Sequence, residues 1–183
     1  MSDPRYPIGE FTHAGPLDDR ARRGCIARIA AAPSLLRVAV AGLVPLQLDT
    51  PYRAEGWTVR QVVHHLPDSH LNGYTRFHLT LTESSPTIKP YDEARWARLP
   101  DSRGPVDFSL DLLEALHRRW VFLLEQLRAE DWERAYHHPG QGRDVTLDEA
   151  LALYAWHGEH HTAHITTLRR RRGWTEPVRT AQA

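Results

Sequence analysis

Two helix starts constrain the fold of this sequence more than any other feature. In the stretch GWTVRQVV, Thr58 precedes an apolar run and Gln61 follows three residues later, and DVTLDEAL repeats the pattern with Thr146 and Glu149. A Thr followed by Gln or Glu at this spacing is typical of a capping box, in which each side chain bonds the backbone N–H group of the other residue. We therefore predict that one helix begins at Thr58 and another at Thr146.

Apolar residues at helical spacing extend from these two starts and recur in two other regions. The first of the two helices is expected to continue toward Pro86, and the second to end at Gly173. The other two expected helices lie within residues 16–43 and 109–129. No segment of any length shows the alternation that predicts a strand. The sequence thus predicts a single all-α domain, residues 1–183, folded as an up-and-down four-helix bundle.

Two connections between the predicted helices are informative. Residues 83–108 hold four prolines and have room for only a short helix, so we expect a long loop that crosses the bundle. Loops of this length often cover a binding site. Within it, Tyr91 and Trp96 are expected to cover such a site or to contact a partner. Residues 136–145 are rich in turn-forming residues, which favours a small hairpin.

Composition excludes several classes of partner. Lys plus Arg and Asp plus Glu number 23 each, so no excess of positive charge favours nucleic-acid binding. The arginines at 169–172 are expected to form a solvated helix end that complements the helix dipole. One cysteine, Cys25, allows no intrachain disulfide. No secretory signal is readable, and the longest apolar stretch, 38–46, is too short to span a membrane. We expect a soluble cytoplasmic protein.

Four histidines lie close together in WHGEHHTAHI, residues 156–165. Because side chains four residues apart share a helix face, His157 with His161 and His160 with His164 form two pairs on faces about 60° apart. The apolar stripe of the last helix directs His157 and His161 inward and leaves the other two as a rival, flanking pair. The spacing is not that of a zinc protease, because Gly158 and His160 stand where its motifs need Glu.

A third ligand is expected from the second helix, where VVHHLPDSHLN offers His64 and His65. On a helix that begins at Thr58, His65 lies on an inward polar strip and His64 is rotated about 100° away. Three neutral imidazoles from two helices leave positions open for water or substrate, as in catalytic divalent metal sites. We expect a metal bound by His65, His157 and His161, the alternative being surface or hydrogen-bonded histidines.

A family resemblance rests on four segments: YPIGEF, LDTPYRAEGWTVRQVVHHLPDSHLNGYTRFHLTLTE, KPYDEARWARL and LALYAWHGEHHTAHI. With them, the sequence resembles the YfiT group of the DinB superfamily over residues 6–174. That superfamily places a ligand histidine eight residues after a helix-opening tryptophan, and an HxxxH pair in the last helix. Trp57 with His65, and His157 with His161, fit this spacing. The resemblance implies a four-helix bundle, a bound Zn²⁺ or Ni²⁺, a homodimer and a metal-dependent hydrolase.

Three interpretations of function remain open. As a hydrolase, the protein would activate a water to attack an ester, an amide or a similar small molecule, with Asp68 or Glu159 as the proton carrier. Related members of the superfamily transfer low-molecular-weight thiols such as bacillithiol or mycothiol. The second interpretation is therefore a thiol S-transferase that acts on an electrophile. The third is a metal-binding bundle without catalysis.

Overall fold

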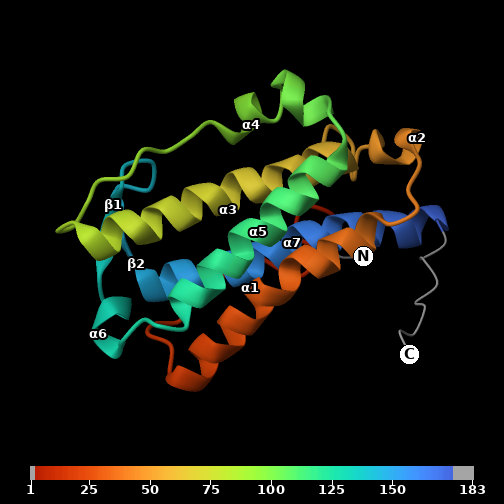
Figure 1. The fold of residues 1–183 in the computed structure, drawn as a ribbon. Helices are drawn as coiled ribbons and strands as arrows, with labels where there is room; N and C mark the ends of the chain where they lie inside the picture. Colours follow the sequence, from red (N-terminus) through yellow and green to blue (C-terminus); the bar gives the residue numbers. More distant parts are fainter. Residues whose placement is uncertain (1–2, 175–183) are drawn as a thin grey trace.

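Four long helices form the centre of the computed structural model, which describes residues 3–174 (Figure 1). They are α1 (Asp19–Val40), α3 (Val59–Thr82), α5 (Val106–Leu124) and α7 (Leu147–Arg172). α1 packs against α5 and α7, and α3 packs against the same two helices. The predicted all-α four-helix bundle is confirmed. The ends of the predicted domain, residues 1–2 and 175–183, lie outside the described residues.

Short elements connect the long helices. They are α2 (Pro45–Leu48), α4 (Glu93–Trp96), the 3-10 helix η1 (Pro100–Arg103), α6 (Ala129–Trp132) and the strands β1 (Ala135–His138) and β2 (Arg143–Thr146). The two strands pair antiparallel, which confirms the predicted hairpin between α5 and α7. Within residues 3–174, no helix combines the length and the apolarity that a membrane span requires.

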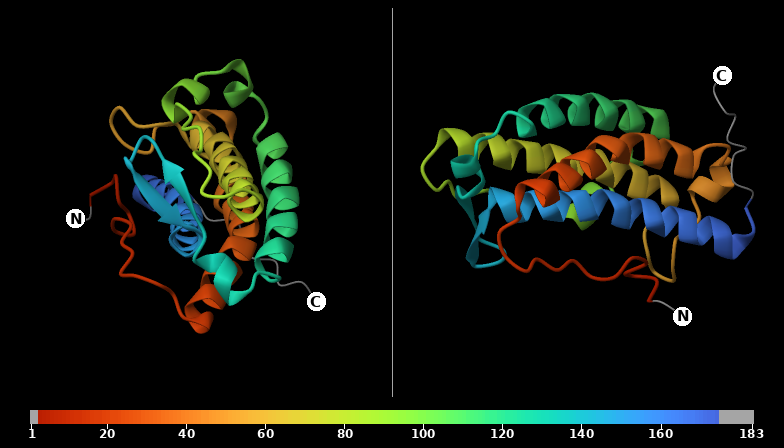
Figure 2. Two further views of the ribbon diagram at one scale, coloured as in Figure 1. Left: turned by 90° about the vertical axis from the view of Figure 1, so that its left-hand side faces the viewer. Right: turned by 90° about the horizontal axis from the view of Figure 1, so that it is seen from below.

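The long connection between α3 and α5 sets the directions of the helices. It leaves the end of α3, runs back along the outside of that helix and carries α4 and η1 before α5 begins (Figure 1). As a result α3 and α5 run in the same direction, whereas α1 and α7 both run in the opposite one (Figure 2). The predicted crossing loop therefore spans the length of the bundle and places its side chains beside α3. The up-and-down order predicted from the sequence was wrong for α3 and α5, because a connection this long returns the chain to the starting end of α3 before α5 begins.

Both predicted helix starts are present, but only one capping box is complete. Thr58 Oγ1 accepts a bond from the Gln61 N–H group at 3.1 Å, and Gln61 Oε1 accepts one from the Thr58 N–H group at 3.0 Å. Thr146 Oγ1 likewise accepts a bond from the Glu149 N–H group at 3.2 Å. The Glu149 carboxylate, however, pairs with Arg143 of β2 at 2.6 Å. The second box is therefore one-sided, because the hairpin offers its glutamate a cation.

Two of the predicted helices contain an internal proline. Pro67 lies inside α3 and Pro33 inside α1, and each removes one N–H donor from its helix. α3 ends at Thr82, before Pro86. α5 begins and ends earlier than the predicted range 109–129, because residues 125–128 turn into α6. The ends of elements are thus less well predicted than their existence.

The arginine run at the end of α7 is not uniformly solvated. Arg169 is 3% exposed, and its guanidinium donates to the backbone carbonyls of Ala39 and Ala41 at 2.9 Å each. These carbonyls lie at the end of α1, where the helix leaves its last acceptors unpaired. The prediction of a solvated run was therefore wrong for Arg169, while the following three arginines are exposed.

The apolar core has two parts. One lies near the hairpin and includes Ile29, Phe77, Trp120, Leu124, Leu147 and Leu151. The other lies near α2 and includes Leu36, Val62, Val63, Leu113, Ile165 and Leu168. On each of α3, α5 and α7 a histidine lies between the residues that belong to the two parts of the core. These histidines are His70, His117 and His157. A polar layer therefore crosses the middle of the bundle.

The segment that precedes α1 lies along α7 (Figure 2). The Phe11 ring lies 5.8 Å from the Trp156 ring, and His164 Nε2 donates to the backbone carbonyl of Arg5 at 3.1 Å. Residues 3–18 thereby add one wall to the region around the clustered histidines.

Candidate metal centre

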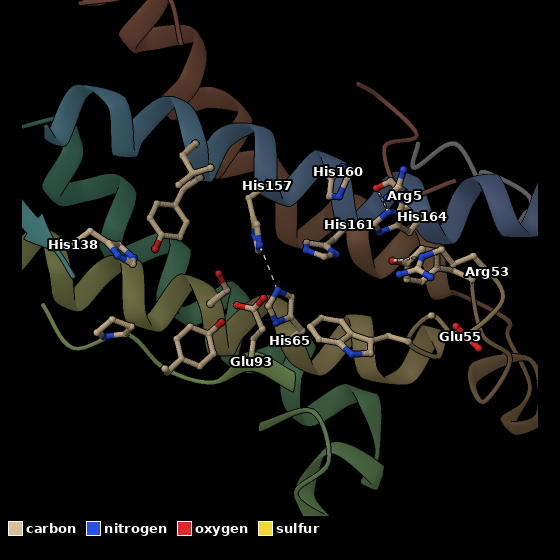
Figure 3. A pocket seen from close by; sticks show the side chains of 18 of the residues that line it. Arg5, Arg53, Glu55, His65, Glu93, His138, His157, His160, His161 and His164 are labelled. Carbon is tan, nitrogen blue, oxygen red and sulfur yellow. Dashed lines mark hydrogen bonds between the residues drawn. The ribbon is translucent and has the colours of Figure 1, made fainter. Parts of the chain in front are cut away.

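Three histidines converge from two antiparallel helices. His65 comes from α3, and His157 and His161 lie one turn apart on α7. One ring nitrogen from each lies within 4.8 Å of the others. The Nε2 atoms of His65 and His157 face each other at 3.3 Å, as the dashed line in Figure 3 shows. Among the residues that the structure describes, this is the group of potential ligands close enough to share one ion.

Local structure fixes the orientation of these side chains. The complete capping box sets the start of α3, and seven residues later His65 packs against Trp57 with ring centroids 4.6 Å apart. On α7 the ring centroids of His157 and His161 lie 4.5 Å apart, as expected for residues four apart on one helix face. The structure therefore brings together the three histidines that the sequence predicts as ligands.

The alternative histidines are engaged elsewhere. His64 is buried on the other side of α3, where Nδ1 lies 2.7 Å from Ser109 Oγ and Nε2 lies 3.2 Å from the carbonyl of Gly104. His160 stacks on Trp156 at 4.2 Å, and His164 stacks on Tyr52 at 4.0 Å. His160 and His164 line the same pocket as the three-histidine group but do not belong to the group itself.

Burial keeps the three imidazoles in the form that binds metals. Desolvation lowers the pKa of His65 to about 4. It also lowers the pKa of His157 and His161 well below the ordinary value, and neighbouring histidines add a smaller effect in the same direction. A neutral imidazole has one nitrogen lone pair available for a metal, whereas a protonated one has none.

A pocket of about 590 Å³ opens onto these histidines (Figure 3). The long connection supplies part of its wall through Pro90, Tyr91 and Glu93. Tyr91 therefore lies at the site, as one of its two predicted roles requires, whereas Trp96 does not line this pocket. Figure 3 shows the Glu93 side chain directed toward the histidines. Arg76 of α3 and Arg53, which precedes α3, also line the pocket. The pocket thus places carboxylate and guanidinium groups around the three imidazoles.

The two carboxylates expected to carry protons do not line this pocket. Glu159 lies on another face of α7 and forms a two-bond ion pair with Arg28 of α1 at 2.6 and 2.7 Å. Burial raises the pKa of Asp68 to about 6, with a further contribution from Asp101, but its side chain is absent from the pocket wall. Glu93, the first residue of α4, does line the wall. The sequence did not reveal it, because its position depends on how the long connection folds back along α3.

The residues present suit a divalent metal ion. Zinc with tetrahedral geometry and Zn–N distances of about 2.0–2.1 Å holds two ligand nitrogens roughly 3.3 Å apart. The Nε2 atoms of His65 and His157 have that separation. Within residues 3–174, the Nδ1 atom of His161 is buried without a hydrogen-bond partner, so that ring is held by packing. Three imidazoles with adjoining open space form a donor set typical of catalytic sites.

Comparison with known proteins identifies the family. A sequence model of the DinB superfamily matches residues 28–165. The chain belongs to the DinB superfamily. Relatives from Bacillus cereus strain AH820 and Bacillus thuringiensis subsp. konkukian strain 97-27 are each 56% identical over 174 residues, which cover 95% of this chain and 100% of theirs. Their names describe them provisionally as metal-dependent hydrolases.

A solved structure agrees with the fold. YfiT from Bacillus subtilis matches with a TM-score of 0.92 and 47% identity over 94% of this chain and 99% of that protein. It is described as a probable metal-dependent hydrolase with an unusual four-helix bundle topology. The resemblance predicted from the sequence is therefore confirmed. The names of these relatives and the three-histidine group together support a divalent metal.

Proposed function

We propose that the protein is a metal-dependent hydrolase in which His65, His157 and His161 hold one divalent ion, zinc or nickel. The observation that carries the proposal is the convergence of three neutral imidazoles on an open pocket. When bound there, such an ion would polarise a substrate carbonyl and make a water molecule acidic enough to lose a proton near neutral pH. The substrate is a small molecule, because the pocket holds about 590 Å³.

The side chains around the centre divide the remaining tasks. Glu93, which faces the histidines, accepts a proton from the attacking water on its carboxylate and returns it to the leaving group. Arg76 donates to the Tyr154 hydroxyl at 3.2 Å and forms no ion pair with a carboxylate among residues 3–174. A pocket guanidinium with a neutral partner is suited to an anionic group on the substrate. We therefore expect a hydrolysable ester or amide that carries a carboxylate or a phosphate.

Metal content and turnover test this proposal together. Untagged protein should contain roughly one zinc or nickel per chain by elemental analysis, and it should hydrolyse members of a panel of small esters and amides, each in a neutral and an anionic form. The panel is run with and without a small thiol. Turnover that requires the thiol would replace the hydrolase with the S-transferase, and bound metal without any turnover would favour the non-catalytic bundle.

The proton carrier is tested by three matched substitutions. Glu93→Gln should lower kcat by about 10²–10⁴-fold while metal content stays unchanged, because only the proton transfer is lost. Asp68→Asn and Glu159→Gln are the controls, since neither side chain lines the pocket. A larger loss of kcat in Asp68→Asn than in Glu93→Gln would return the role to Asp68.

A further inference from the structure

Hydrogen bonds link the candidate metal centre to the backbone of α1 on the far side of the polar layer. His157 Nδ1 lies 3.1 Å from His70 Nε2, and His70 Nδ1 lies 2.9 Å from His117 Nε2. His117 Nδ1 lies 2.6 Å from the carbonyl oxygen of Ile29. The chain thus runs from α7 through α3 and α5 to α1, so each long helix contributes one member.

The backbone carbonyl gives this chain a direction. A carbonyl oxygen only accepts, so Nδ1 of His117 must carry a hydrogen. Nε2 of a neutral His117 is then an acceptor, and Nδ1 of His70 must donate to it. By the same step Nε2 of His70 accepts, and Nδ1 of His157 donates. All three rings are therefore Nδ1–H tautomers, and the Nε2 lone pair of His157 is free.

These tautomers exist only if the rings of His70 and His117 are neutral, and the surroundings of the two rings ensure it. His70 is 0% exposed and His117 is 1% exposed. Neither has a carboxylate among its hydrogen-bond partners within residues 3–174. A buried imidazolium without a counter-charge is costly, and it would also lack the acceptor nitrogen that each bond in the chain uses.

We propose that His70 and His117 are positioning residues that fix His157 in the tautomer and orientation needed to bind the metal ion. The Nε2 atom released by this chain is the one that faces His65 Nε2 at 3.3 Å. The proposal rests on the proposed function in one respect, that His157 is a metal ligand. Partners that orient a ligand histidine typically contribute 10–100-fold to metal affinity.

Nuclear magnetic resonance of metal-free protein tests the tautomers directly. Two-bond ¹H–¹⁵N spectra of ring-labelled histidine distinguish the Nδ1–H, Nε2–H and protonated forms, and single-histidine variants assign the signals. His70, His117 and His157 should each show the Nδ1–H form. An Nε2–H form at His157 in the wild-type protein would overturn the proposal without any reference to metal or turnover.

Zinc affinity tests the effect on the ligand. His117→Phe removes the link to Ile29 and should raise the zinc dissociation constant by about 10–100-fold. His117→Gln should retain most of the affinity, because its amide offers one donor and one acceptor on a single carbon, as the two ring nitrogens do. His64→Phe is the matched control, since it removes another buried histidine with two hydrogen bonds from α3. It should leave zinc affinity unchanged.

The possible outcomes separate this proposal from the proposed function. Equal losses of zinc affinity in His117→Phe and His64→Phe would overturn the positioning role, because any buried histidine would then matter. Three Nδ1–H tautomers in a wild-type protein that binds no zinc would support the chain of hydrogen bonds and overturn the metal site. Zinc binding that survives His117→Phe unchanged would support the metal site and overturn the positioning role.

Discussion

At the scale of single residues, the centre depends on which histidine nitrogens meet. His157 and His161 share one face of α7, and His65 reaches them from α3. Replacing any of these three with Ala should abolish stoichiometric zinc binding, because two imidazoles cannot hold the ion against water. His160→Ala and His164→Ala should retain it, since their rings stack on Trp156 and Tyr52. Titration calorimetry on the five variants measures this. If His160→Ala and His164→Ala lose zinc while His157→Ala and His161→Ala keep it, the site lies on the adjacent face of α7.

A second prediction concerns pH and the free energy of unfolding. Burial lowers the pKa of His117 from 6.5 to about 4, and the bond to the Ile29 carbonyl opposes this only in part. Between these values the unfolded chain binds a proton that the folded protein does not. The stability that the neutral His117 contributes to the folded protein is therefore complete above pH ~6.5. It falls by up to about 3 kcal/mol as pH decreases toward ~4.

Urea unfolding across this pH range, with a chelator present, measures the effect. The wild-type free energy of unfolding should decrease from pH 6.5 to pH 4. In His117→Phe the decrease should be shallower, because about one proton fewer is taken up on unfolding. Leu113→Ala is the control, because it removes buried apolar volume one turn away on α5 and no titrating group. It should lower stability similarly at every pH. Identical slopes in wild type and His117→Phe would contradict the prediction.

The sequence predicted part of this site for physical reasons. The spacing of His157 and His161 and the position of His65 after a capped helix start depend on helix geometry alone, so they were accessible. The bond between His70 and His117 joins α3 to α5 and depends on how the helices pack, which spacing does not specify. The position of Glu93 depends on how the long connection that carries α4 folds back along α3. For the same reason Glu159 was misplaced, because its ion pair with Arg28 exists only once α1 packs on α7.

At the scale of elements, the contact between α3 and α7 depends on a glycine. A Cβ atom at Gly73 would lie 2.7 Å from the nearest edge carbons of the Tyr154 ring and still closer to Cζ. Tyr154 lines the pocket and follows the same face of α7 as His157. The absence of a side chain at Gly73 therefore sets how closely the two ligand-bearing helices approach.

Gly73→Ala should destabilise the fold by about 1–3 kcal/mol, because the added methyl group must displace a fully packed ring. Gly24→Ala is the matched control on α1, where a Cβ atom meets nothing within 4 Å. That change should stabilise the protein by about 0.5–1 kcal/mol, as expected for Gly to Ala inside a helix. Chemical denaturation of both variants measures their free energies of unfolding. Equal changes in the two variants would show that the Tyr154 ring leaves room for a methyl group at residue 73.

The elements themselves were largely predictable from local chemistry. Thr58 and Thr146 start helices because their hydroxyl groups satisfy backbone N–H groups within a few residues. Gly173 ends α7 with a φ of 65°, a conformation in which glycine is favoured. Pro67 lies inside α3, as the predicted helix from Thr58 toward Pro86 requires, because packing of α3 against its neighbours outweighs the lost hydrogen bond. Tertiary contacts, not local propensity, decide such positions.

At the scale of the whole molecule, the family resemblance predicts a homodimer. The chain belongs to the DinB superfamily, and the resemblance to it implies a dimer. Several large apolar side chains are also exposed, among them Leu46, Phe108 and Phe122 at 81%, 71% and 70%. Light scattering at micromolar concentration should give about twice the chain mass of 21.0 kDa. A mass of one chain, unchanged over a tenfold range of concentration, would remove the prediction.

The last prediction joins the metal centre to the stability of the bundle. An ion held by His65 on α3 and by two histidines on α7 would tie together two helices that run in opposite directions. Because the unfolded chain does not assemble these ligands, metal at a thousandfold excess over its dissociation constant should stabilise the fold by about 4 kcal/mol. For a chain of this size the Tm should rise by roughly 10 °C.

Thermal unfolding with zinc and with a chelator measures this difference. His161→Ala should lose the increment, and His160→Ala, its neighbour on α7, should keep it. A small, zinc-independent change in Tm in either variant reports packing alone, so the decisive quantity is the difference between the zinc and chelator curves. If that difference is the same in both variants, zinc binds elsewhere and His161 is not one of its ligands.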